Sequence, residues 1–300
     1  MSATAFLSSV ELGLFYSLMT LGLFISYRIL DIADLTVDGS FTLGAAVCAM
    51  ITISGHPILA LFAAAATGGI AGIVTALLQT RLKVQPILAG ILTMTGLYSI
   101  NIMVMKGSPN KSLNGETTVF TLMNNLGIPS VYVPLVLGIL VTVIIGIFIV
   151  LFLQTPLGLA IRATGDNEDM VRSSSINVRA IKIIGLSLAN FFVALSGGLI
   201  AQYQSFADIS SGVGMVVIGL ASLIIGEIIF GKKSVKGNVL AAIFGSIIYR
   251  FIIQIALEVN ISFSSMKLVS AVIITIAISF PAIREQIKLA KLKKRSKTNA

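Results

Sequence analysis

The sequence is poor in the residues that build redox and metal sites, and it carries few charges. It contains one cysteine, Cys48, one histidine, His56, and no tryptophan among 300 residues. A disulfide framework, a cysteine–histidine zinc site and a haem-attachment motif all need more ligands than these, so all three are excluded. Charged residues make up 11% of the chain, whereas about a quarter is typical of soluble domains.

Long apolar runs dominate what remains, because 56% of the residues are hydrophobic. A helix needs about 20 apolar residues to cross a bilayer, and in lipid it satisfies its own backbone hydrogen bonds. The sequence therefore predicts an all-α, polytopic transmembrane bundle of about nine spans in one domain, residues 1–283, followed by a basic tail, residues 284–300. The expected spans are 5–27, 39–55, 57–80, 86–105, 131–153, 179–203, 214–231, 237–257 and 266–283. No Lys or Arg precedes the first run, and it is too long for a signal-peptide core, so we interpret it as a retained span.

The distribution of Lys and Arg predicts the orientation of the bundle. One set of alternate gaps holds 17 of the 21 basic residues, and the other set holds only Lys106, Lys111 and Lys267. Basic residues concentrate in cytoplasmic loops. The 154–178 segment, the 232–236 turn and the C-terminus are therefore expected in the cytoplasm, and the 106–130 loop outside.

The segment 28–38, RILDIADLTVD, interrupts this pattern with Asp31, Asp34 and Asp38. Asp38 with the following Gly and Ser forms a plausible helix N-cap, which favours a broken second span of the kind that lines transport pathways. The alternative is that the three carboxylates lie in a cytoplasmic turn and pair with Arg28.

The longest cytoplasmic gap reads TPLGLAIRATGDNEDMVRSSSINVRAIK, from Thr155 to Lys182. Gly165 is expected to break the chain, and Asp166 to cap a short helix in which Met170 and Val171 form an apolar knob between charges. Such a helix suits insertion into a groove on a cytoplasmic partner. An ordinary solvated loop at the membrane surface is the alternative.

The pattern Gly158-x-x-x-Arg162-Ala163, followed by Asn167 and then Ile176-Asn177, resembles the cytoplasmic coupling segment of permeases in the branched-chain amino acid and ribose importer family. The segments LTVDGSFTLGAAV, SLANFFVALSGGLIAQYQ and GLASLIIGEIIFGKKSVKGNVLAAIFGS look like spans of the same family, so the similarity covers most of the chain. It is greatest to a subgroup proposed to serve aromatic amino acids such as tryptophan.

The resemblance implies a permease subunit of an ATP-binding-cassette importer in a bacterial cell membrane, with a vitamin-B12-permease-like fold. A second permease copy, cytoplasmic P-loop ATPase subunits and an extracellular binding protein would be its partners. This chain would bind no cofactor, because ATP is used by the partner subunit. A coupling helix from Gly165 to Ser175 is implied. Ser175 stands where the family usually has Gly, which leaves the end of that helix open. The residues implied to couple to the ATPase are Gly158, Arg162, Gly165, Asp166, Asn167, Met170, Val171 and Arg172.

Glu227 and Arg250 are ionisable groups within apolar runs and are costly there unless paired or wetted. Snorkelling of both side chains to the membrane interface is one interpretation, and an ion pair between Glu227 and Arg250 is the other. Asn101 and Asn190 are expected to line a polar pathway or to pair helices. Tyr98 is one of several aromatic residues that could contact an aromatic substrate.

Two other classes of function compete with the importer. An ion-driven secondary transporter would use Asp31, Asp34, Asp38 or Glu227 to bind protons or sodium at broken helices. A membrane enzyme is disfavoured because the chain lacks H-E-x-x-H, G-x-S-x-G and P-loop motifs. Without a P-loop, an ATP-driven transporter must obtain its phosphate cradle from another subunit.

Overall fold

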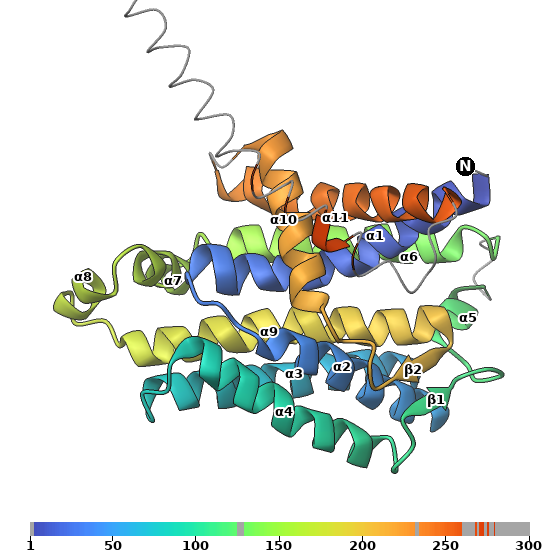
Figure 1. Ribbon diagram of the computed structural model, residues 1–300, viewed down its shortest axis with the longest axis horizontal. Helices are drawn as coiled ribbons and strands as arrows, with labels where there is room; N and C mark the ends of the chain where they lie inside the picture. The colour runs from blue at the N-terminus through green and yellow to red at the C-terminus, as the bar shows by residue number, and fades with distance from the viewer. Residues whose placement is uncertain are drawn as a thin grey trace, which may run out of the picture.

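Long helices lie side by side in a computed structural model of the chain (Figure 1), which describes residues 3–124, 129–231 and 234–259 and positions 268, 270–272, 275 and 279. The helices are α1 (Ala3–Leu23) with its π-helical continuation η1 (Phe24–Ile29), α2 (Thr36–Ile53), α3 (Pro57–Thr80), α4 (Pro86–Val104), α5 (Val119–Asn124), α6 (Val133–Phe152), α7 (Pro156–Asp166), α8 (Glu168–Ser173), α9 (Val178–Gln204), α10 (Met215–Phe230) and α11 (Val235–Glu258).

Seven of these helical segments are long and apolar enough to cross a membrane: Thr4–Ile29, α2, α3, α4, α6, α9 and α11. The prediction of an all-helical polytopic protein is thus confirmed. The run expected as a span at 214–231 forms α10, which has only 16 residues. The expected span 266–283 lies mostly, and the tail 284–300 wholly, outside the described residues, so the total of nine stays a prediction.

The two ends of the bundle differ. At one end, α7 and α8 project beyond the long helices, and we refer to this as the α7–α8 end (Figure 1). At the opposite end β1 (Asn110–Ser112) and β2 (Phe206–Asp208) form a small antiparallel pair, which joins the loop after α4 to the end of α9. We call this the β-strand end.

Helix α9 is the centre of the packing and contacts α1, α2 and α3. Small residues permit this close approach: a Cβ on Gly44 of α2 would overlap the Ala194 backbone, and one on Gly197 of α9 would overlap the Phe41 carbonyl. Helices in lipid associate largely through such close packing, because the acyl chains are as apolar as the helix surfaces and the hydrophobic effect does not drive the helices together.

Two helices begin inside the bundle instead of at its ends. The non-helical stretch after η1 runs back into the bundle before α2 begins, and α10 likewise starts near its middle (Figure 1). Gly39 in the first turn of α2 packs against Met94 and Leu97, in the middle of α4. The second span thus begins inside the bundle after a non-helical stretch, but α2 itself is continuous and begins at Thr36, before the predicted Asp38.

Candidate functional site

The segment between α6 and α9 folds into two short helices at the α7–α8 end. The hydroxyl of Thr155 caps α7 by accepting the Gly158 N–H at 3.2 Å. The side chain of Asn167 caps α8 by accepting the Met170 N–H at 3.0 Å. Two predictions for this segment are wrong: Gly165 lies within α7 and does not break it, and Asp166 ends α7 and does not cap α8.

The predicted apolar knob consists of Met170 alone. Met170 is 55% exposed, whereas Val171 is 1% exposed and packs inward. Glu168 fixes α8 to α9, because its two carboxylate oxygens bind Arg172 and Lys182 at 2.6 Å each. The hydrogen bond from Lys182 is the main reason that the pKa of Glu168 is lowered, so this pairing persists at neutral pH and weakens only as the pH falls through that lowered pKa.

Ser175 adopts a left-handed backbone conformation, with φ of 61°. This is the conformation for which glycine is favoured after a helix. Helix α8 ends at Ser173, and Ser174 is its C-cap. The short helix is therefore Glu168–Ser173 and not the expected Gly165–Ser175.

Gly165 joins this segment to the break before α2. A Cβ at this position would overlap the carbonyl oxygen of Ile29 and approach the backbone of Leu30. The side chain of Leu30 in turn packs against Gly185 of α9. The absence of a side chain at Gly165 therefore allows α7 to pack directly against the segment that leads into α2.

Asp34 lies in that break and is buried, with 3% exposure. Its carboxylate accepts the Thr36 N–H at 2.9 Å and the Asn190 Nδ2–H at 2.7 Å. The Thr36 hydroxyl continues the network to Thr75 at 2.7 Å. Asn190 thus pairs α9 with the start of α2, and the alternative of Asp34 in a solvated turn is wrong.

Asp38 connects the two helices that begin inside the bundle. Its carboxylate accepts the backbone N–H groups of Gly214 and Val216, at 2.9 and 2.8 Å. Backbone donors at a helix N-terminus inside a membrane need such an acceptor. Asp38, predicted to cap its own helix, instead caps α10.

The hypothesis of an ion pair between Glu227 and Arg250, one of the two interpretations of these residues, is wrong. Glu227 pairs with Arg28, with 2.9 Å between Arg28 Nε and Glu227 Oε1. Arg250 lies instead over the ring of Tyr16, 4.0 Å from its centroid, in a cation–π contact. Glu227 and Arg250 do not meet because they lie at different depths in the bundle. Glu227 is near the C-terminal end of α10, towards the α7–α8 end, whereas Arg250 is in the C-terminal half of α11, which runs towards the β-strand end.

Exchanging the charges of this pair provides a test. Glu227→Arg alone should lower the melting temperature of the detergent-solubilised protein by placing two cations together. Breaking a buried pair costs roughly 3–5 kcal/mol, and less is expected here because the Arg28 side chain is 38% exposed. Adding Arg28→Glu should restore most of the loss, whereas adding Arg250→Glu should not. Equal rescue by the two second-site changes would contradict the pairing.

Glu11 is a buried ionisable residue that the sequence reasoning missed. It is 4% exposed, and its Oε2 accepts the Tyr203 hydroxyl at 2.8 Å. A lone acid in an apolar run is a signal that could have identified it. Within the described part of the chain, no group of three or more His, Cys, Asp or Glu side chains is arranged to hold a metal ion.

A pocket of about 310 Å³ with a mainly apolar wall and several polar side chains lies beside Asp38, between α2, α4 and the loop 209–213. It brings together Asp38 and Asn101, two of the predicted pathway residues, with Thr42, Thr95 and Tyr98. Asn190, Glu227 and Arg250, which were expected either in a pathway or in helix pairing, do not line it. The predicted set is therefore divided into pocket residues and helix-pairing residues.

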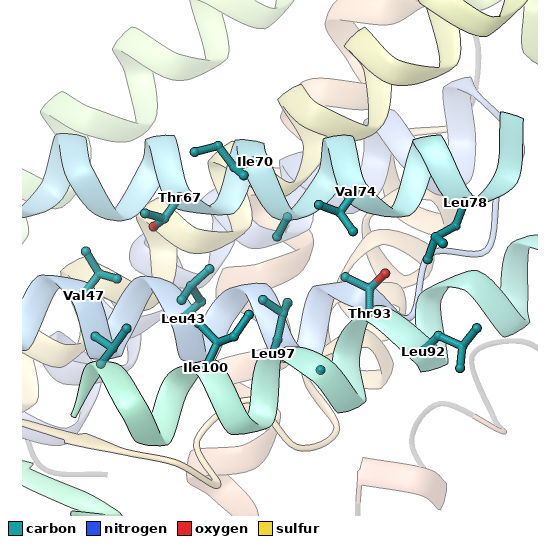
Figure 2. Close-up of a pocket in the computed structure, with 13 residues that line it drawn as sticks. Leu43, Val47, Thr67, Ile70, Val74, Leu78, Leu92, Thr93, Leu97 and Ile100 are labelled. Atoms are coloured by element: carbon teal, nitrogen blue, oxygen red, sulfur yellow. The ribbon is translucent and has the colours of Figure 1, made fainter. Parts of the chain in front are cut away.

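The groove drawn in Figure 2 is different in character. It has a volume of about 460 Å³ and lies between α3 and α4, with Leu43 and Val47 of α2 also lining it. The hydroxyl of Thr93 on this surface donates to the Ala89 carbonyl at 3.0 Å. No charged residue or amide lines the groove, so it offers little to orient a polar solute.

Comparison with known proteins identifies the family of this chain. The family model described as "Branched-chain amino acid transport system / permease component" matches residues 6–279. A tyrosine transport system permease protein of Clostridioides difficile (strain R20291) is 38% identical, over 89% of this chain and 88% of the relative. The ribose import permease protein RbsC of Escherichia coli (strain K12) is 29% identical, over 82% of this chain and 75% of the relative. No solved structure matches the chain. The chain belongs to the branched-chain amino acid transport permease family, whose members are membrane-spanning subunits of ATP-binding-cassette transporters.

Proposed function

We propose that this chain is the permease subunit of an importer that moves an amino acid into the cytoplasm, driven by a separate ATPase that docks on the α7–α8 segment (Pro156–Ser173). The observation that carries the proposal is the exposed side chain of Met170. It projects from a short helix that is capped by Asn167 and tied to α9 through Glu168. An exposed apolar side chain on a short helix that is held in place in this way can insert into a groove on a protein partner.

The charge distribution supports a cytoplasmic position for this end. Among the described residues, the α7–α8 end carries Arg28, Arg81, Lys83, Arg162, Arg172, Arg179, Lys182 and Lys236, whereas the β-strand end carries Lys106 and Lys111. Basic loops face the cytoplasm. In this orientation the β-strand end faces outward, where a binding protein delivers the solute, and a second permease copy completes the pathway. ATP binds the partner ATPase, and this chain needs no cofactor.

Amino-acid cargo is favoured by the relative named a tyrosine transport permease, which is more similar than the relatives named ribose import permeases. Two of the carboxylates that an ion-driven transporter could use are buried and engaged in helix packing. Asp34 is bonded to Thr36 and Asn190, and Glu227 pairs with Arg28. These bonds favour the ATP-driven alternative.

The test is affinity purification of the tagged chain from its native membrane, followed by mass spectrometry of the proteins that accompany it. A P-loop ATPase should accompany the wild-type chain and Met170→Leu, because leucine preserves the apolar contact. Its recovery should fall about tenfold or more with Met170→Asp, which places a charge in the contact. Normal membrane insertion of Met170→Asp is the control for folding. Recovery of no ATPase with the wild type, or undiminished recovery with Met170→Asp, would contradict the proposal.

A further inference from the structure

The pocket beside Asp38 lies at the start of α2, next to the loop that leads into α10 and level with the middle of α4. Its volume of about 310 Å³ is at the lower limit of ligand sites, which occupy roughly 300–1,000 Å³. Discontinuous helices near the middle of a membrane are the usual frame of solute sites in transporters. A small polar solute would fit here.

The polar groups around this pocket are mainly hydrogen-bond acceptors. The Asp38 carboxylate, which accepts the Gly214 and Val216 N–H groups, is an acceptor that carries negative charge. Thr42 donates its hydroxyl proton to the Asp38 carbonyl at 3.1 Å, and Thr95 donates to the Ile91 carbonyl at 2.8 Å, so both present lone pairs. Among the residues that the structure describes, neither Lys nor Arg lines the pocket.

One acceptor at this pocket is buried and has no donor among the described residues. Asn101 is 1% exposed; its Nδ2 donates to the Gly39 carbonyl at 3.4 Å, and its Oδ1 accepts no hydrogen bond. The hydroxyl of Ser211, next to the lining residue Gly212, is also buried and without a partner. Buried polar atoms of this kind are uncommon in folded proteins and indicate a missing donor.

We propose that this pocket binds the ammonium group of the transported amino acid during passage, and this inference rests on the proposed function. An ammonium carries three donors and a positive charge, which the Asp38 carboxylate and Asn101 Oδ1 complement. The ring of Tyr98 at the pocket adds a face suited to a cation. A neutral sugar has no positive charge to interact with Asp38. The pocket therefore favours an amino acid over a sugar, the two kinds of solute in the names of the relatives.

The test uses Thr95→Cys in the full-length chain in lipid nanodiscs, because Thr95 is exposed at the pocket. The only native cysteine, Cys48, is buried. Rates of labelling are compared for 2-aminoethyl methanethiosulfonate, which carries an ammonium, and 2-sulfonatoethyl methanethiosulfonate, which is an anion. Ser54→Cys, exposed at the β-strand end, is the matched control. The ratio of cationic to anionic rates should be about tenfold higher at Thr95→Cys than at the control.

Variants of Asn101 and a pair of competing solutes complete the test. Asn101→Leu should reduce the rate ratio, and Asn101→Asp should increase it. L-phenylalanine in excess should slow labelling more than 3-phenylpropanoate, which has the same ring and carboxylate but no ammonium. The inference would be overturned if Thr95→Cys were labelled by neither reagent, or if its rate ratio equalled that of the control. It would also be overturned if neither Asn101 variant changed the ratio, or if the two solutes protected equally. None of these measurements involves the ATPase, so a failure of ATPase docking is recognised separately.

Discussion

Replacing Gly165 with valine should abolish most uptake while leaving the permease inserted and bound to its ATPase. The added side chain would overlap the Ile29 carbonyl and press on Leu30, where α7 meets the break before α2. Overpacking a tight site costs roughly 1–3 kcal/mol, and about 1.4 kcal/mol corresponds to a tenfold change. If α7 carries the proposed coupling to the ATPase through this contact, uptake should fall about 10- to 100-fold.

The measurements are uptake of radiolabelled solute and co-purification of the ATPase from the same membranes. Gly96→Val is the matched control, because Gly96 also lies within a helix but a Cβ there meets nothing within 4 Å. The control should retain uptake near the wild-type level. Wild-type uptake by Gly165→Val would show that the contact between α7 and Ile29 transmits nothing. Joint loss of uptake and ATPase binding would show that the residue acts on docking instead.

Replacing Asp38 with alanine should destabilise the start of α10 more than any change in an exposed carboxylate. The Gly214 and Val216 N–H groups would lose their acceptor inside the bundle. Each buried unsatisfied group costs roughly 1–3 kcal/mol, so a decrease of about 2–6 kcal/mol in the free energy of unfolding is expected. Asp38→Asn keeps one acceptor oxygen and should have an intermediate effect.

Thermal unfolding in detergent gives the global effect, and hydrogen exchange of the amides from Gly214 to Val216 gives the local one. Asp169→Ala is the control, because Asp169 is exposed in the first turn of α8. That change should leave the exchange of the α10 amides as it is in the wild type. Unchanged exchange in Asp38→Ala would mean that another group satisfies these donors.

Part of the site could be predicted because it depends on residues that are close together in the sequence. The exposed Met170 and the break before the second span depend on local chemistry: an apolar residue between charges, and carboxylates in an apolar run. The left-handed backbone at Ser175 was not predicted, because serine stands there in place of the glycine usual in the family. The cap of α8 was missed by one residue, because Asp166 and Asn167 are both good N-caps and adjacent positions compete. Only the helix geometry selects Asn167.

The sequence by itself determined that the chain is a polytopic helical membrane protein, which of its loops are basic, and to which family of permeases it is similar, because apolar length and local motifs are properties of continuous segments. The tertiary structure decided the partners of the charged side chains within the bundle. Arg28 with Glu227, Asp34 with Asn190, and Asp38 with the start of α10 are separated by more than 150 residues in the chain. Their pairing depends on the depth and rotation at which helices pack, and hydrophobic periodicity does not encode depth between separate helices.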